Sequence, residues 1–175
     1  LSRFQQRLLD WYDAHPGAIQ PEFRGNEALG LIRGGLRDFS VSRTSLQWGI
    51  PLPFDSNYVT YVWFDALLNY VSALDYRGGD SLVKFWPRTN HLIAKDILKA
   101  HAIYWPTMLM AAGMPLYQHF NVHGYWVMDS GKMSKSLGNV IRPLEMKERF
   151  GMDAFRYFLL REMASRSDAA PVVSL

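Results

Sequence analysis

Cysteine is missing from the 175 residues, which excludes a disulfide framework and a cysteine-based zinc site in this segment. Long apolar runs are missing too, so the sequence predicts no membrane span, and no signal-peptide pattern opens the chain. The excess of positive over negative charge is small: the net charge is +3, and lysine and arginine form no stripe. We therefore expect a soluble protein of the cytoplasm, or of an organellar matrix, with no membrane partner.

Hydrophobic residues make up 49% and aromatic residues 14% of the chain, enough for a substantial core. The length fits one domain, or a domain with a fragment of a second. The chain starts at Leu1, inside a helical pattern and without a methionine, so we expect a piece of a longer protein. The sequence leaves the oligomeric state open.

Strand-like and helix-like segments alternate along the middle of the chain, which is typical of a parallel α/β sheet. The β-branched and aromatic run Tyr58–Phe64 predicts a buried strand, and Asp65 is expected to cap a helix over 66–74. Shorter strands are expected at His91–Ala94 and Phe120–His123. This order predicts about half of a doubly wound sheet, with ligands at the carboxyl ends of its strands.

The other helices are marked by apolar spacing and by stop signals. Pro106 predicts a kink in the helix that precedes Gly113. The expected helices cover residues 2–14, Pro21 to Gly34, 97–112, 143–150 and 153–163.

Ile97, His101 and Trp105 are four residues apart, so they share one face of the predicted helix. That stripe is typical of a helix packed on a sheet, and a histidine within it is more often a satisfied core residue than a ligand. Arg43 is a cation among neutral hydroxyl residues in a short strand that turns into a loop. It could reach an anionic group, or it could be an ordinary surface arginine.

The run Lys132-Met133-Ser134-Lys135-Ser136 lies in a segment rich in glycine and serine. Two ammonium groups on a pliable loop suit a substrate whose negative charge grows during reaction, such as a triphosphate. A bare K-x-x-K pattern alone favours a solvated basic turn, but the whole run is far more specific. A Walker A phosphate loop is excluded because Gly124 and Gly131 are too far apart.

This run resembles the lysine loop of class I aminoacyl-tRNA synthetases. Together with Tyr61–Ala66, His91–Ile97 and Trp105-Pro106, it resembles methionyl-tRNA synthetases over nearly the whole chain up to Glu162. The resemblance implies a Rossmann-like nucleotide-binding half-domain with flanking helices, incomplete relative to the full family domain. It implies three regions. Residues 1–54 would be a helical segment and connector that enter the catalytic domain, and residues 55–139 would be the second half of that domain, ending in the lysine loop. Residues 140–175 would be the start of a helical region that contacts the tRNA stem.

The resemblance also implies the site residues. Methionine would contact aromatic and apolar side chains, whose edges suit a polarisable thioether, and Tyr70 or His101 could offer the sulfur a proton. The implied methionine-binding residues are Trp63, Ala66, Tyr70, Ile97, His101 and Trp105. The implied ATP-binding residues are Asp96, His123, Gly124, Lys132 and Lys135, and the implied catalytic residues are Lys132, Lys135 and Arg43.

In such enzymes methionine and ATP give methionyl-adenylate, with Mg²⁺ as cofactor, and the acyl group then passes to tRNA(Met). Ala94 departs from the family, which commonly has glycine beside the nucleotide. The family's histidine signature, any zinc-bearing insertion and the anticodon-reading helices are not in this sequence, so we expect the isolated chain to be inactive. A non-catalytic nucleotide- or tRNA-binding module, and a fragment that associates through exposed apolar surface, are the alternatives.

Overall fold

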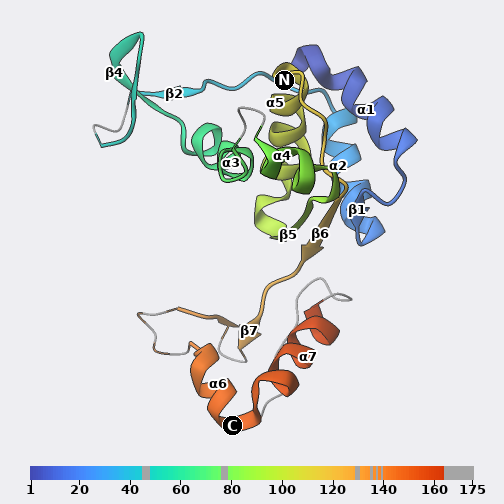
Figure 1. Ribbon diagram of the computed structural model, residues 1–175, viewed down its shortest axis with the longest axis vertical. Coiled ribbons are helices and arrows are strands. Elements are labelled where there is room, and N and C mark those ends of the chain that lie inside the picture. Colours follow the sequence, from blue (N-terminus) through green and yellow to red (C-terminus); the bar gives the residue numbers. More distant parts are fainter. Residues whose placement is uncertain are drawn as a thin grey trace.

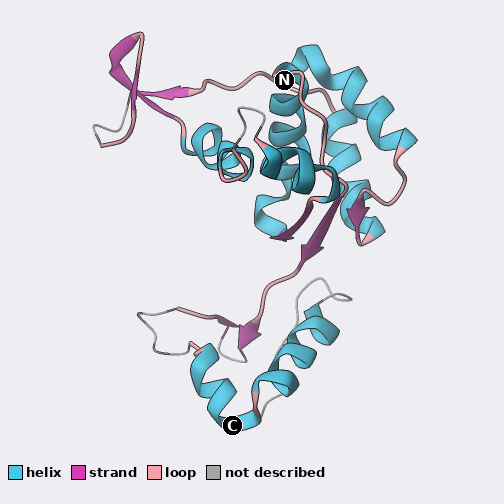
Figure 2. Cartoon of the chain, viewed as in Figure 1, coloured by secondary structure: helices cyan, strands magenta, loops and turns pink. Residues whose placement is uncertain are grey.

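The computed structural model describes residues 1–44, 48–75, 79–128, 131–134, 136, 138 and 140–163, with the backbone alone at 127, 128, 131, 132 and 163. Figures 1 and 2 show a larger upper part and a smaller lower part, joined by an extended segment that follows β6 (His119–His123). Within the described residues, every helix is too short or too polar to cross a bilayer.

Two helices open the larger part, as predicted. A 3-10 turn (Ser2–Phe4) leads into α1 (Gln5–Ala14), and α2 (Glu22–Arg33) follows. Each helix buries two residues one turn apart, which is the spacing of a single core-facing stripe. These buried residues are Leu8 and Tyr12 in α1, and Ala28 and Ile32 in α2.

A parallel sheet lies at the centre of the larger part, and its strand order is β1-β6-β5. β5 (Asn90–Ala94) pairs along its whole length with β6, and β1 (Ile19–Gln20) pairs with the other side of β6. Alternate residues of β5 and β6 are buried, so the sheet packs one face against the helices. The strands predicted at 91–94 and 120–123 are confirmed, whereas β1 was not predicted because two residues carry no periodicity.

The predicted buried strand Tyr58–Phe64 is wrong in its extent and in its sheet. β4 (Asp55–Thr60) ends two residues before α3 (Val62–Ser72), and it pairs antiparallel with β2 (Ser42–Arg43) and β3 (Pro51–Leu52). This second sheet projects from the larger part (Figure 1).

The cap of α3 was also placed wrongly, because Tyr61 precedes the helix and Asp65 lies in its first turn. Leu67 and Val71 are buried at helical spacing, and Trp63 packs against the same core. Tertiary packing of this stripe therefore overrides the strand propensity of the aromatic run.

The helix predicted over 97–112 is divided into three conformations. A 3-10 turn, η3 (Lys95–Ile97), is followed by a π-helical segment, η4 (Ala100–Tyr104), and then by α5 (Trp105–Ala111). Pro106 has no N–H to donate to the carbonyl of Ala102, and the hydroxyl of Tyr12 donates to that carbonyl instead, at 2.8 Å. The irregularity predicted at Pro106 is thus present as a change of helix type.

Two short helical elements that lead into β5 were not predicted. A short helix, α4 (Asp80–Phe85), and a 3-10 turn (Trp86–Arg88) lead into β5. Trp86 is almost fully buried, and its indole N–H donates to the carbonyl of Pro115 at 2.8 Å. This turn fixes the start of the strand that carries His91.

The smaller part begins with a short antiparallel pair, β7 (Val127–Met128) and β8 (Gly131–Lys132). Two helices follow, α6 (Pro143–Phe150) and α7 (Met152–Met163), and Gly151 between them has a φ of +79°, as expected for a glycine helix stop. Both helices were predicted. The ring centroids of Trp126 and Phe158 lie 5.1 Å apart, so α7 packs against the segment that follows β6.

Candidate functional site

Five ring-bearing side chains from four different elements lie close together. We call them the aromatic cluster: Trp63 and Tyr70 from α3, His91 from β5, His101 from η4 and Trp105 from α5. The ring centroids of Trp63 and His101 are 5.9 Å apart at 80°, and those of Tyr70 and Trp105 are 5.9 Å apart. The first pair is edge-to-face, a favourable arrangement for aromatic rings, and the second is tilted at 49°. Four of the six residues predicted to bind methionine are therefore brought together.

The hydrogen bonds of His101 determine its tautomer. Its Nδ1 lies 3.0 Å from the carbonyl oxygen of Ile97, which can only accept, so Nδ1 carries the proton. Its Nε2, 2.9 Å from the hydroxyl of Tyr70, must then accept, and Tyr70 donates. The pKa of His101 is lowered overall, because the effect of burial outweighs that of the hydrogen bond to Ile97, which by itself would raise the pKa. The imidazole is therefore neutral near pH 7.

His91 is the member of the cluster that the sequence did not suggest. It is only 4% exposed, and the indole Nε1–H of Trp105 donates to its Nε2 at 3.3 Å. Burial, with a further contribution from neighbouring His101, lowers the pKa of His91 to about 4. The alternation of the strand was the one available signal, because it places His91 on the same buried face as Ile93.

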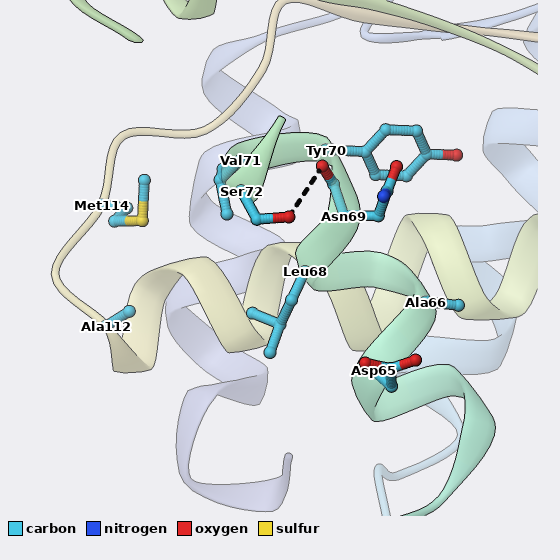
Figure 3. A pocket seen from close by; sticks show the side chains of 9 residues that line it. All are labelled: Asp65, Ala66, Leu68, Asn69, Tyr70, Val71, Ser72, Ala112 and Met114. Carbon is cyan, nitrogen blue, oxygen red and sulfur yellow. Dashed lines mark hydrogen bonds between the residues drawn. The ribbon is translucent and has the colours of Figure 1, made fainter. Parts of the chain in front are cut away.

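Ile97 and Ala66, the other two residues predicted to bind methionine, are not part of the aromatic cluster. Ile97 is half-buried against the core, and its carbonyl orients His101. Ala66 is exposed and, with Tyr70, borders a cavity of about 800 Å³ between α3 and the loop after α5. Figure 3 shows Met114 on that loop, on the opposite side of the view from the Tyr70 ring. The cavity thus adjoins the aromatic cluster through Tyr70.

Three of the five residues predicted to bind ATP lie at, or directly after, the carboxyl ends of two neighbouring parallel strands. Ala94, the last residue of β5, pairs in register with His123, the last residue of β6. Asp96 follows Ala94 within η3 and is exposed. The Nδ1 of His123 lies 2.7 Å from the carbonyl oxygen of Gly124 and donates to it. Asp96, His123 and Gly124 therefore share the edge of the sheet at which open α/β sheets bind ligands.

Arg43 lies in β2, at the base of the projecting sheet. Its Nη1 donates to the carbonyls of Ser40 and Ser42 at 2.9 and 2.8 Å, and its guanidinium carbon is 3.7 Å from the centroid of the Tyr61 ring. Phe39 contacts Tyr61 at 5.7 Å between centroids and stacks on Tyr104 of η4 at 4.6 Å. A chain of rings therefore connects Arg43 to the π-helical segment that carries His101.

The lysine loop is described in part. The backbone of Lys132 lies in β8, opposite Val127, and the hydroxyls of Ser134 and Ser136 are 2.8 Å apart. Lys135 lies outside the described residues. The loop belongs to the smaller part of the molecule, whereas the aromatic cluster belongs to the larger part (Figure 1).

The profile of the family described as class I (M) tRNA synthetases matches residues 1–172. The chain belongs to the methionyl-tRNA synthetase family. A methionine–tRNA ligase of Rickettsia bellii (strain RML369-C) is 48% identical over 169 residues, which are 96% of this chain and 33% of that protein. A methionine–tRNA ligase of Clostridium perfringens (strain 13 / Type A) is 51% identical over 171 residues, with coverage of 96% and 26%.

Solved structures of the same family share the fold. Methionyl-tRNA synthetase of Mycobacterium tuberculosis bound by methionyl-adenylate superposes with a TM-score of 0.85 at 40% identity, covering 97% of this chain and 34% of that one. Its apo form superposes with a TM-score of 0.81 at 37% identity. The resemblance seen in the sequence is confirmed, and so is the α/β fold. The chain spans between a quarter and a third of the length of the two ligases.

Proposed function

We propose that this chain supplies the methionine pocket and part of the ATP site of a methionine–tRNA ligase. The main support for the proposal is the path of residues 90–104, from β5 to η4. β5 places His91 in the aromatic cluster, ends at the ligand-binding edge with Ala94, and continues through Asp96 to His101. This segment links the aromatic cluster to the strand end, and a reaction between an amino acid and a nucleotide would require the two proposed binding regions to be adjacent.

The methionine pocket is proposed to be built from Trp63, Ala66, Tyr70, Ile97, His101 and Trp105. Sulfur is polarisable and is favoured at the edges of aromatic rings, which Trp63, Tyr70 and Trp105 can present. The neutral state of His101 also suits a pocket for an uncharged side chain. An adjacent cavity of about 800 Å³ reaches Ala66 and Tyr70 and offers an approach from solvent.

The nucleotide is proposed to bind along the sheet edge, with Asp96 on the ribose and His123-Gly124 beside the adenine. Asp96 is exposed and free to accept hydrogen bonds from hydroxyl groups. Ala94 is half-buried at this edge, and its methyl group would either crowd the ribose or require a small shift of the backbone. Lys132 and Lys135 are proposed to offset the charge of the departing pyrophosphate, and Arg43 to assist activation.

The proposed reaction is attack of the methionine carboxylate on the α-phosphorus of ATP, followed by transfer of the acyl group to tRNA(Met). Mg²⁺ would supply positive charge at the phosphates. Among the described residues, no group of three or more His, Cys, Asp or Glu side chains is placed to hold a metal ion. The nucleotide phosphates would therefore be its main ligands, as is usual for this ion. We place the reaction in the cytoplasm, with an organellar matrix as the alternative.

The proposed domain organisation follows the sheets. Strands before and after residue 54 pair with each other, because β1 pairs with β6 and β2 pairs with β4. Residues 1–54 and 55–139 are therefore proposed to form one catalytic unit, with 1–54 as its entering segment. Residues 140–175, which begin with α6 and α7, are proposed as the start of the tRNA stem-contact region.

The test is methionine-dependent exchange of pyrophosphate into ATP by the full-length protein. We expect exchange by that protein and none by the isolated 175 residues. Lys135→Ala should lower kcat far more than it raises the KM for methionine, because its charge acts on the transition state. Lys84→Ala, which removes a lysine on α4, is the matched control. Methionine binding by the full-length protein without exchange would instead support a non-catalytic module.

A further inference from the structure

We propose that His91 is a positioning residue for methionine: it sets the orientation of the Trp105 and Tyr70 rings that form the pocket. This inference rests on the proposed function and deepens it. His91 does not border the cavity beside α3 and is not among the residues that the sequence suggested for the site. It acts through its two neighbours.

The contact with Trp105 fixes that indole in one orientation. Trp105 is fully buried, and its Nε1–H finds its acceptor in Nε2 of His91 at 3.3 Å. A buried N–H without a partner is strongly disfavoured, so the indole ring is held where this bond can form. Because Nε2 accepts, the proton of the neutral imidazole of His91 lies on Nδ1.

The contact with Tyr70 acts on the second ring. The rings of His91 and Tyr70 have centroids 4.4 Å apart and an interplanar angle of 67°, the shortest ring separation within the aromatic cluster. Tyr70 in turn donates to His101, whose ring lies 5.7 Å from its own. A single side chain on β5 therefore supports three of the rings proposed to line the methionine pocket.

His91 is itself rigidly placed by the sheet and the core. Its residue pairs in register with Phe120 on β6, and its ring contacts those of Tyr117 and Phe120, each at 5.2 Å between centroids. A phenylalanine would fill the same volume without accepting a hydrogen bond. A buried histidine at this position is therefore explained by its acceptor atom, and the acceptor serves Trp105.

The experiment compares His91→Phe and His91→Gln in the full-length protein, by pyrophosphate exchange at varied methionine and at varied ATP. Phenylalanine keeps a ring and removes the acceptor, whereas glutamine places an amide oxygen near the position of Nε2. We expect His91→Phe to raise the KM for methionine about five- to tenfold, the equivalent of one lost hydrogen bond, and to leave the KM for ATP unchanged. His91→Gln should restore most of the methionine affinity.

Tyr117→Phe is the matched control, because Tyr117 also contacts His91 but its hydroxyl is shared with Tyr12 in the core. It should lower stability and leave the methionine KM unchanged. A double-mutant cycle of His91→Phe with Trp105→Phe should be non-additive, since either change removes the same bond.

Three results would overturn the inference while leaving the proposed function intact. They are a wild-type methionine KM in His91→Phe, equal KM increases for methionine and ATP, and additivity in the cycle. Absence of exchange in the unmodified full-length protein would instead refute the proposed function. If His91→Phe fails to fold, the comparison of His91→Gln with Trp105→Phe decides: the inference requires the glutamine variant to bind methionine better.

Discussion

The hydroxyl of Tyr70 donates its only proton to Nε2 of His101, at 2.9 Å. His101 in turn donates the proton on its Nδ1 to the carbonyl of Ile97. The Tyr70 hydroxyl and the His101 imidazole, two polar groups of the proposed methionine pocket, both donate to protein acceptors in this structure. An offer of a proton from Tyr70 or His101 to the sulfur would require one of these bonds to change when methionine binds, so we propose that the ring edges recognise the thioether.

The first prediction concerns selectivity between methionine and norleucine, which replaces the sulfur with a methylene group. Contacts between sulfur and aromatic rings differ from those of a methylene by about 0.3–1.5 kcal/mol, so we expect a ratio of kcat/KM values between roughly two and ten. Tyr70→Phe should weaken binding of both amino acids and leave that ratio unchanged. The ratio is measured by pyrophosphate exchange, and a clear fall in Tyr70→Phe would show that the tyrosine donates to sulfur.

The second prediction is a loss of stability in mild acid. His91 has a pKa of about 4 in the folded protein, against about 6.5 in the unfolded chain. Between these values the unfolded state binds more protons, so the free energy of unfolding falls as the pH is lowered from about 6.5 to about 4. A shift of this size corresponds to roughly 3 kcal/mol.

Denaturant unfolding of the full-length protein at several pH values between 7.5 and 4.5 measures this slope. His91→Gln should flatten it, because glutamine does not titrate. His15→Gln removes an exposed histidine that stacks on Trp11, and it serves as the control. Equal slopes in the wild type and in His91→Gln would contradict the prediction.

The sequence identified the elements that carry their own local signals and missed those that depend on packing. Helix α1 and helix α6 were found from apolar spacing and from Gly151 at the end of α6. The start of α3 was missed because Val62 and Trp63 have strand propensity, and the core contact of Trp63 becomes visible only in three dimensions. Spacing alone did not separate a helix from a strand there.

The site was predictable only through resemblance. Trp63 and His101 belong to different helical segments, and no periodicity joins them. His91 escaped even the resemblance, because its role depends on the indole N–H of Trp105, a partner that the sequence does not specify. A buried polar atom acquires a function from the group it faces, and that group is known only from the fold.

The third prediction concerns the carbonyl of Ala102, to which Pro106 cannot donate. Tyr12→Phe removes the hydroxyl that donates to Ala102 and should lower the free energy of unfolding by about 1–3 kcal/mol. In a Pro106→Ala background the residue at 106 regains an N–H that can donate to Ala102. Tyr12→Phe should therefore lower the free energy of unfolding by less in that background. Thermal or denaturant unfolding of the four proteins gives the coupling energy, and strict additivity would show that the two groups do not serve the same carbonyl.

The fourth prediction follows from the ring beneath the Arg43 guanidinium. The guanidinium lies 3.7 Å from the centroid of Tyr61, and Phe39 links Tyr61 to Tyr104 of η4. Tyr61→Leu should lower kcat for pyrophosphate exchange by about three- to tenfold, the range of a cation–π contact, because Arg43 loses its orientation. Tyr61→Phe keeps the ring and should retain activity near that of the wild type. If Tyr61→Leu and Tyr61→Phe were equally impaired, the tyrosine hydroxyl, and not the ring, would be what Arg43 requires.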